Sequence, residues 1–192
     1  ATLTGRVRAD VLLLESDERY AAHSFKFFHP TQFVITNLYR DQLTRNGHPE
    51  WVYDAILPAI HPDTELLLNA DDPLVSCFAR GHEKVKWFGL DPQVLSLPAP
   101  TGVYHDGAYC PVCKGPMEYG SVHYNHIGDF RCTRCGHRRH ETDFTVTAAD
   151  LDRGILTLDN AVTVKLSFRS IYNVYNILAA YSVCRTIGIA AD

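Results

Sequence analysis

The chain has 192 residues, of which 46% are hydrophobic and 21% charged, an ordinary composition for a globular domain. This composition excludes a largely disordered chain, a collagen-like chain and a coiled coil. The formal net charge of −4 excludes a general polyanion binder, and no apolar run approaches the roughly 18 residues of a membrane helix. Because the N-terminus also lacks a signal-peptide pattern, we expect a cytoplasmic protein with one domain and a small insertion.

The first half of the chain alternates short apolar runs with helical segments. Four predicted strands share this pattern: residues 10–15, 32–37, 65–69 and 84–88. Continuous apolar runs of this length are typical of strands buried on both faces. A helix is predicted over residues 49–60, with Pro49 in its first turn and Pro58 near its end. Strands separated by helices predict an α/β fold, with a mostly parallel sheet and helices on its faces.

Four of the six cysteines form two C-x-x-C pairs, Cys110 with Cys113 and Cys132 with Cys135, separated by 18 residues. This spacing is typical of a four-cysteine zinc site, because two thiolates two residues apart can converge on one tetrahedral metal. Disulfides are disfavoured without a secretory signal, and a redox pair would occur once rather than twice. We therefore predict an inserted zinc ribbon over residues 106–143, with structural Zn²⁺.

Five histidines crowd the same region: His105, His123, His126, His137 and His140. One of them could replace a cysteine as ligand, but four cysteines already complete a structural site, so surface positions are expected for the histidines. A nucleic-acid-binding module is an alternative, because Tyr119, Tyr124 and Phe130 could stack on bases. The small net charge of the ribbon favours a structural insert instead. Cys77 and Cys184 are expected to be buried thiols.

The segment after the ribbon predicts a hairpin and a long helix. Residues 154–158 and 161–166 flank Asp159 and Asn160, as in a β-hairpin. A helix is predicted over residues 170–187, where apolar side chains recur at helical spacing. Its apolar stripe consists of Val174, Ile177, Leu178, Tyr181 and Cys184. The chain thus divides into a first part of the α/β domain, the ribbon and a second part of the domain, at residues 1–105, 106–143 and 144–192.

Polar side chains follow the predicted strands. Glu15, Asn37 and Asn69 each come at the end of an apolar run, with Asp41 and residues 71–72 close behind. In an open parallel sheet, ligands bind outside the carboxyl ends of the strands, and carboxylates there suit Mg²⁺ and phosphates. Each residue taken singly could also be a simple turn former. The set together favours a binding site.

The last predicted helix carries a pair of amides. Asn173 and Asn176 are three residues apart and therefore share a face of the helix. Two amides on one face could hydrogen-bond an adenine edge, or they could serve helix packing. The residue types leave both interpretations open.

Three of these segments resemble successive motifs of the central domain of the Mur ligase family. They are TNLYRDQL at residues 36–43, LNADDP at residues 68–73 and YNVYNILAA at residues 172–180. The inserted ribbon resembles one branch of that family, the synthetase subunits of lipid II isoglutaminyl synthase. The order and spacing of the motifs fit, and the resemblance spans nearly the whole chain.

The resemblance implies an ATP- and Mg²⁺-dependent carbon–nitrogen ligase with glutamine as amide donor. Such a subunit activates the α-carboxyl of D-glutamate in lipid II as an acyl phosphate. Ammonia from a GatD-type glutaminase then forms D-isoglutamine during peptidoglycan biosynthesis. The resemblance also implies that Asn69, Asp72, Asn173 and Asn176 contribute to the ATP site and that Glu15 binds Mg²⁺.

Some positions depart from the pattern of the amino-acid-adding Mur ligases. Tyr172 and Gln42 stand where many of those enzymes have histidines, and no lysine occurs between residues 41 and 69. These departures suit the amidating branch. The phosphate cradle of the family is expected before Ala1 and its C-terminal domain after Asp192, so the chain is expected to be a central-domain fragment that is inactive alone.

Two further alternatives fit the same residues. The chain could be another Mur or folylpolyglutamate-type ligase, although the ribbon and the missing lysine disfavour that reading. It could also be a nonenzymatic scaffold derived from the fold. The catalytic residues themselves are expected outside this chain.

Overall fold

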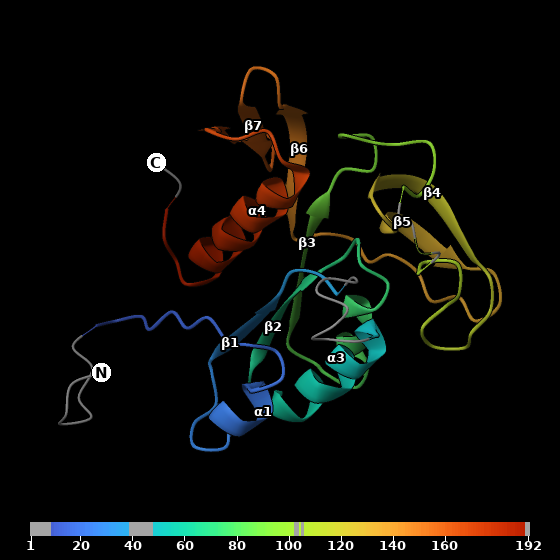
Figure 1. Ribbon diagram of the computed structural model, residues 1–192. Helices are drawn as coiled ribbons and strands as arrows, with labels where there is room; N and C mark the ends of the chain where they lie inside the picture. The colour runs from blue at the N-terminus through green and yellow to red at the C-terminus, as the bar shows by residue number, and fades with distance from the viewer. Residues whose placement is uncertain (1–8, 39–47, 102–103, 105, 191–192) are drawn as a thin grey trace.

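A six-stranded sheet forms the centre of the molecule (Figure 1). The computed structural model describes residues 9–38, 48–101, 104 and 106–190. In spatial order the sheet contains β1 (Gln32–Ile35), β2 (Glu65–Asn69), β3 (Val85–Leu90), β6 (Phe144–Asp150), β7 (Ile155–Leu158) and β8 (Val162–Lys165). The first four are parallel to one another, and β7 and β8 are added antiparallel. The predicted α/β fold with a mostly parallel sheet is confirmed.

Helices cover both faces of this sheet. In chain order they are α1 (Ala21–Ser24), α3 (Pro49–Ile56), the 3-10 turns η1 (Leu57–Ala59) and η2 (Val75–Ala79), and α4 (Ile171–Thr186). Figure 1 shows α4 on one side of the sheet and α3 on the other. The ring of His48 accepts a hydrogen bond from the amide of Glu50 and so caps the start of α3. Pro58 lies in η1, where the predicted helix tightens and ends.

The sheet separates two apolar cores. Leu67 of β2 and Phe88 of β3 are fully buried against α4. Leu66 and Leu68 point the other way and pack with Ile35 beneath α3 and η2. Because successive side chains of a strand alternate between faces, the continuous apolar run of β2 serves both cores. The sequence prediction of a strand buried on both faces is therefore confirmed for β2.

The structure contradicts the strand predicted at residues 10–15. Residues 10–17 have no regular secondary structure, and the leucines and valine of this run are 49–84% exposed. A strand needs a neighbour to satisfy its backbone hydrogen bonds, and within the described part of the chain no strand pairs with this run. An apolar run alone is therefore not sufficient to predict a strand.

Two other elements were not predicted, while the C-terminal predictions are confirmed. Strand β6 and the short helix α1 are absent from the elements expected from the sequence. The hairpin forms as expected, with Asp159 and Asn160 in the left-handed region at φ 50° and 55°. Helix α4 matches the predicted span, although Cys184 is half-buried rather than buried.

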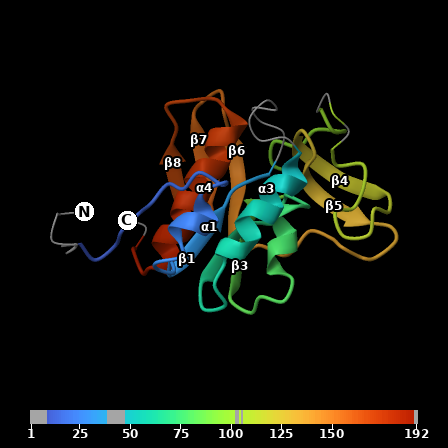
Figure 2. The same cartoon turned by 60° about the horizontal axis from the view of Figure 1, so that its bottom comes forward.

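A second, two-stranded sheet lies apart from the first (Figures 1 and 2). It pairs β4 (Met117–Tyr124) with β5 (Ile127–Cys132) in antiparallel register. The tip of this hairpin nevertheless joins the main core, because Tyr124 and Ile127 pack with the residues beneath α4. None of the helices in the described ranges has the length and apolar character to cross a bilayer.

Candidate metal centre and ligand edge

The four cysteines of the ribbon converge on one point. Their Sγ atoms all lie within 4.8 Å of one another, and the Cys110–Cys135 and Cys113–Cys132 sulfur pairs are 3.7 and 3.5 Å apart. A tetrahedral zinc site with Zn–S bonds near 2.3 Å places its sulfurs about 3.8 Å apart. The cluster could therefore hold a metal ion, and its geometry is compatible with structural zinc.

Backbone turns shape this cluster. Lys114 and Gly136, which follow the second cysteine of each pair, both have positive φ, at 58° and 76°. The amides of Arg134 and Cys135 approach the sulfur of Cys132 at 3.4 and 3.5 Å. Hydrogen bonding from Cys135 is the largest influence that lowers the pKa of Cys132, to about 6. The thiolate is the form that binds zinc. Within the same cluster, burial instead raises the pKa of Cys110 to about 12.

The other ribbon side chains argue against base stacking. Tyr124 and Phe130 are 4% and 1% exposed, and the hydroxyl of Tyr119 donates a hydrogen bond to the carbonyl of Gly107. Tyr124 packs in the main core with Tyr175, and the ring of Phe130 packs against His137 within the ribbon. Moreover, His123 and the neighbouring His126 are buried, so the expectation of surface histidines is wrong for these two.

Hydrogen bonds join the first two resemblance motifs at the carboxyl ends of β1 and β2. The Asn69 side chain donates to the carbonyl of Thr36 at 2.7 Å and accepts from the amide of Asp71 at 2.9 Å. The Asp72 carboxylate accepts from the amide of Leu38 at 2.7 Å and from two amides at the start of η2. Asn69 and Asp72 are both fully buried. In this structure they hold the edge together from within.

The third motif reaches the same edge through Tyr175. Its hydroxyl donates to the Asp71 carboxylate at 2.7 Å, and both groups are buried. Tyr175 lies between Asn173 and Asn176, whose side chains are in contact at 3.4 Å on the outer surface of α4. The two amides thus share a face, as predicted, at the end of α4 that lies near the carboxyl ends of the strands.

A residue of the ribbon completes this network. Arg139 donates from Nε to the Asp71 carboxylate at 2.6 Å and from Nη2 to the carbonyl of Leu90 at 2.8 Å. The Leu90 amide also donates to Asp71. A Cβ on Gly89 would come within 2.7 Å of Asp71 and 3.0 Å of Arg139, so the ion pair fits only over a glycine. Asp71 therefore connects β2, β3, α4 and the ribbon.

Sequence reasoning missed the central role of this ion pair. In the sequence, Arg139 is one of several basic residues in the ribbon, and Asp71 is one of the carboxylates that follow a predicted strand. One signal was available, since a run of polar residues directly after a buried strand is where a charged partner from another segment is needed. The sequence cannot show which arginine supplies it.

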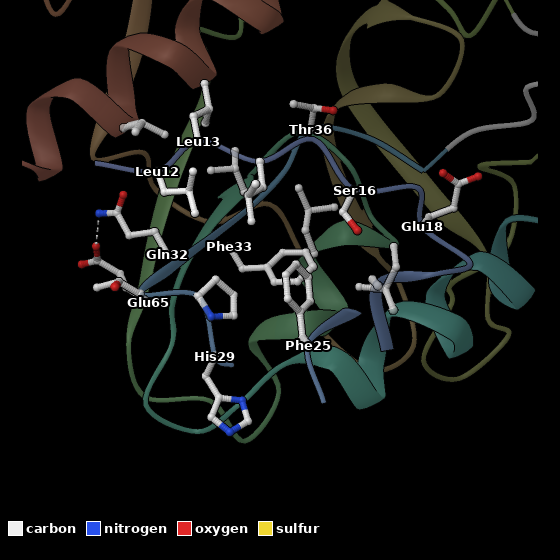
Figure 3. A pocket seen from close by; sticks show the side chains of 18 of the residues that line it. Leu12, Leu13, Ser16, Glu18, Phe25, His29, Gln32, Phe33, Thr36 and Glu65 are labelled. Atoms are coloured by element: carbon white, nitrogen blue, oxygen red, sulfur yellow. Dashed lines mark hydrogen bonds between the residues drawn. The ribbon is translucent and has the colours of Figure 1, made fainter. Parts of the chain in front are cut away.

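The structure does not bring Glu15 to this network. Its side chain is exposed in the segment before α1. A mostly apolar cavity of about 1080 Å³ lies beside β1, and Figure 3 shows Leu12, Leu13, Phe25 and Phe33 among the side chains that line it. Thr36 and Asn37 line this cavity, whereas Glu15 does not. Asp41 and Gln42 lie outside the described residues.

Sequence comparison relates this chain to proteins of known function. The chain is 29% identical over 183 residues to the MurT subunit of lipid II isoglutaminyl synthase from Staphylococcus aureus (strain COL), covering 95% of the chain and 41% of the relative. It is 32% identical over 187 residues to MurT of Streptococcus pneumoniae (strain ATCC BAA-255 / R6), covering 93% and 40%. This chain is a homologue of MurT. The resemblance predicted from the motifs is thereby confirmed.

A solved structure extends the comparison. The pseudomurein peptide ligase type C from Methanothermus fervidus superposes with a TM-score of 0.71 at 26% identity, over 88% of this chain and 33% of that one. The Mur ligase-like fold is therefore shown. No family model matches the sequence. The chain spans about two fifths of the length of the MurT relatives.

Proposed function

We propose that this MurT-like chain is the nucleotide-binding central part of an ATP-dependent ligase subunit that acts in the cytoplasm on a peptidoglycan precursor. With glutamine as amide donor and a GatD-type glutaminase as partner, the intact protein would amidate the α-carboxyl of D-glutamate in lipid II. ATP would supply the activation of that carboxylate as an acyl phosphate. The catalytic groups for this step are expected outside the 192 residues.

The observation that carries this proposal is the junction of the three motifs. Thr36, Asn69 and Asp72 lie at one edge of the sheet, and Tyr175 brings α4 to the same edge. Asn173 and Asn176 stand beside it with their amides toward the surface. Amides have both the donors and the acceptors that an adenine edge requires. We assign adenine binding to this pair of asparagines. Asn69 and Asp72 would contribute to the ATP site by holding the backbone around it in place.

The test is an amidation assay on the intact protein together with its glutaminase. With lipid II, MgATP and glutamine, we expect conversion of D-glutamate to D-isoglutamine. Asn173→Ala and Asn176→Ala should each raise the KM for ATP about two- to tenfold, the value of one neutral hydrogen bond. Gln93→Ala, an exposed amide outside the motifs, is the control.

Two results would contradict the proposal. One is an intact, correctly assembled protein that forms no D-isoglutamine under these conditions. The other is an active protein in which both asparagine variants keep the KM for ATP of the wild type, because the adenine would then bind elsewhere.

A further inference from the structure

The ribbon and the nucleotide-binding motifs share one buried charge pair. The Arg139 side chain is 12% exposed and the Asp71 side chain 0%. Among the described residues, the Asp71 carboxylate accepts hydrogen bonds from donors of three other elements: Nε of Arg139, the amide of Leu90 and the hydroxyl of Tyr175. A buried carboxylate with three donors is held in one position. Each donor therefore fixes Asp71 relative to its own element.

The ribbon presents Arg139 from a rigid framework. The Arg139 amide donates to the carbonyl of Phe130, and the Cys132 amide donates to the carbonyl of His137, with an N···O distance of 2.6 Å. The segment after Cys135 thus runs beside β5. A metal held by the four cysteines would fix this segment at Cys135, four residues before Arg139. A second anchor is the amide of Gly128, which donates to the carbonyl of Asp71.

Asp71 in turn belongs to the motif that shapes the proposed ATP site. Its amide donates to the side chain of Asn69, which holds Thr36. Its carboxylate holds Tyr175, the residue between the two surface asparagines of α4. The path from the ribbon to both halves of the ligand edge therefore runs through direct contacts of 2.6–2.9 Å.

We propose that the zinc ribbon is a positioning device for nucleotide binding, and that Arg139 is the residue through which it acts on Asp71. This inference rests on the proposed function. Arg139 is a positioning residue, because it contacts the carboxylate of Asp71 and neither of the amides assigned to the adenine. Loss of either the metal or the guanidinium should let the Asn69–Asp72 turn and the start of α4 move independently.

The first test compares Arg139→Ala with Arg138→Ala in the intact protein and its glutaminase. Both variants remove one positive charge from the ribbon, but the side chain of Arg138 is exposed. Arg139→Ala should raise the KM for ATP about two- to thirtyfold, the range of coupling through a residue that does not touch the ligand. kcat per zinc-loaded molecule should change less, and Arg139→Lys should restore part of the affinity.

The second test asks whether zinc and Arg139 act along the same path. Removing zinc from the wild type with a chelator should raise the KM for ATP by a similar factor. Removing zinc from Arg139→Ala should add little, because interacting sites are non-additive. Hydrogen exchange without nucleotide provides a readout independent of activity, and Arg139→Ala should accelerate exchange in peptides covering residues 69–72 and 171–178.

These outcomes separate the two proposals. If the wild type fails to amidate lipid II, the proposed function fails, and the exchange readout still tests the coupling. If the wild type is active but Arg139→Ala only lowers kcat, leaves the KM for ATP unchanged or leaves exchange at residues 69–72 unchanged, the inference is overturned. Fully additive effects of zinc removal and Arg139→Ala would overturn it as well.

Discussion

At the residue scale, His123 is the buried group with the clearest consequence. It is 3% exposed, and neither ring nitrogen has a hydrogen-bond partner among the described residues. Burial lowers its pKa, with the charge of Asp71 opposing and that of Arg139 reinforcing this effect. The ring of Tyr175 lies next to the His123 ring in an edge-on arrangement, and the centroids of the two rings are 6.4 Å apart. The folded protein thus holds His123 in its neutral form.

The sign of the resulting pH dependence follows directly. Below about pH 6.5, the ordinary histidine value, the unfolded chain takes up a proton that folded His123 resists, so stability falls as the pH falls. His123→Leu should reduce the loss of unfolding free energy between pH 7.5 and 5.5, measured by urea denaturation. His23→Leu, at an exposed histidine, should not. Equal acid sensitivity of wild type and His123→Leu would contradict this account.

At the element scale, the structure divides the ribbon into two parts. The cysteine end is organised by the metal ligands, whereas Tyr124 and Ile127 at the tip are packed in the main core. Structural zinc contributes about 10–16 kcal/mol to the folding of small metal-dependent units. Zinc removal should therefore unfold the cysteine end and leave the tip and the six-stranded sheet in place.

Hydrogen exchange with and without a chelator measures this division. Amides of residues 110–117 and 130–138 should lose protection, while those of residues 122–128 and of β2 and β3 should keep most of theirs. Cys132→Ser should reproduce the effect of the chelator. Loss of protection throughout the chain would mean that the ribbon and the sheet fold as one cooperative unit, contrary to the prediction.

The elements also show what the sequence could and could not predict. β2, the β7–β8 hairpin and α4 were predictable, because each combines a local pattern with its own turn or cap signals. The run at residues 10–15 has the same apolar pattern as β2 but no strand beside it among the described residues. Whether an apolar segment becomes a strand depends on whether the fold places another strand beside it, which the segment's own sequence does not show. The cysteine spacing predicted the converging thiolates, since ligand geometry is local.

The site was predictable only in outline. Polar residues after strands predicted that Asn69 and Asp72 would lie at one edge with Asn37. The hydrogen bonds there join Asn69 to Thr36 and Asp72 to Leu38, the residues on either side of Asn37. The sequence could not show that Asn69 and Asp72 are buried and hydrogen-bonded to backbone groups. Those bonds depend on where the surrounding turns place their backbone amides and carbonyls. The contribution of Arg139 depends on how a distant insert docks.

At the scale of the whole molecule, the central claim is that three segments distant in sequence form one nucleotide-binding edge. The buried network of Asp71 holds that edge together. A ligand bound there should order all three motifs at once, because they share this network. Binding at any other surface would order them unequally or not at all.

Hydrogen exchange of the intact protein with and without MgATP tests this claim most directly. We predict slower exchange in peptides covering residues 36–38, 69–72 and 171–178 together, and weaker protection in all three for Asn173→Ala. Protection confined to other segments, with these three unchanged at saturating nucleotide, would contradict the account.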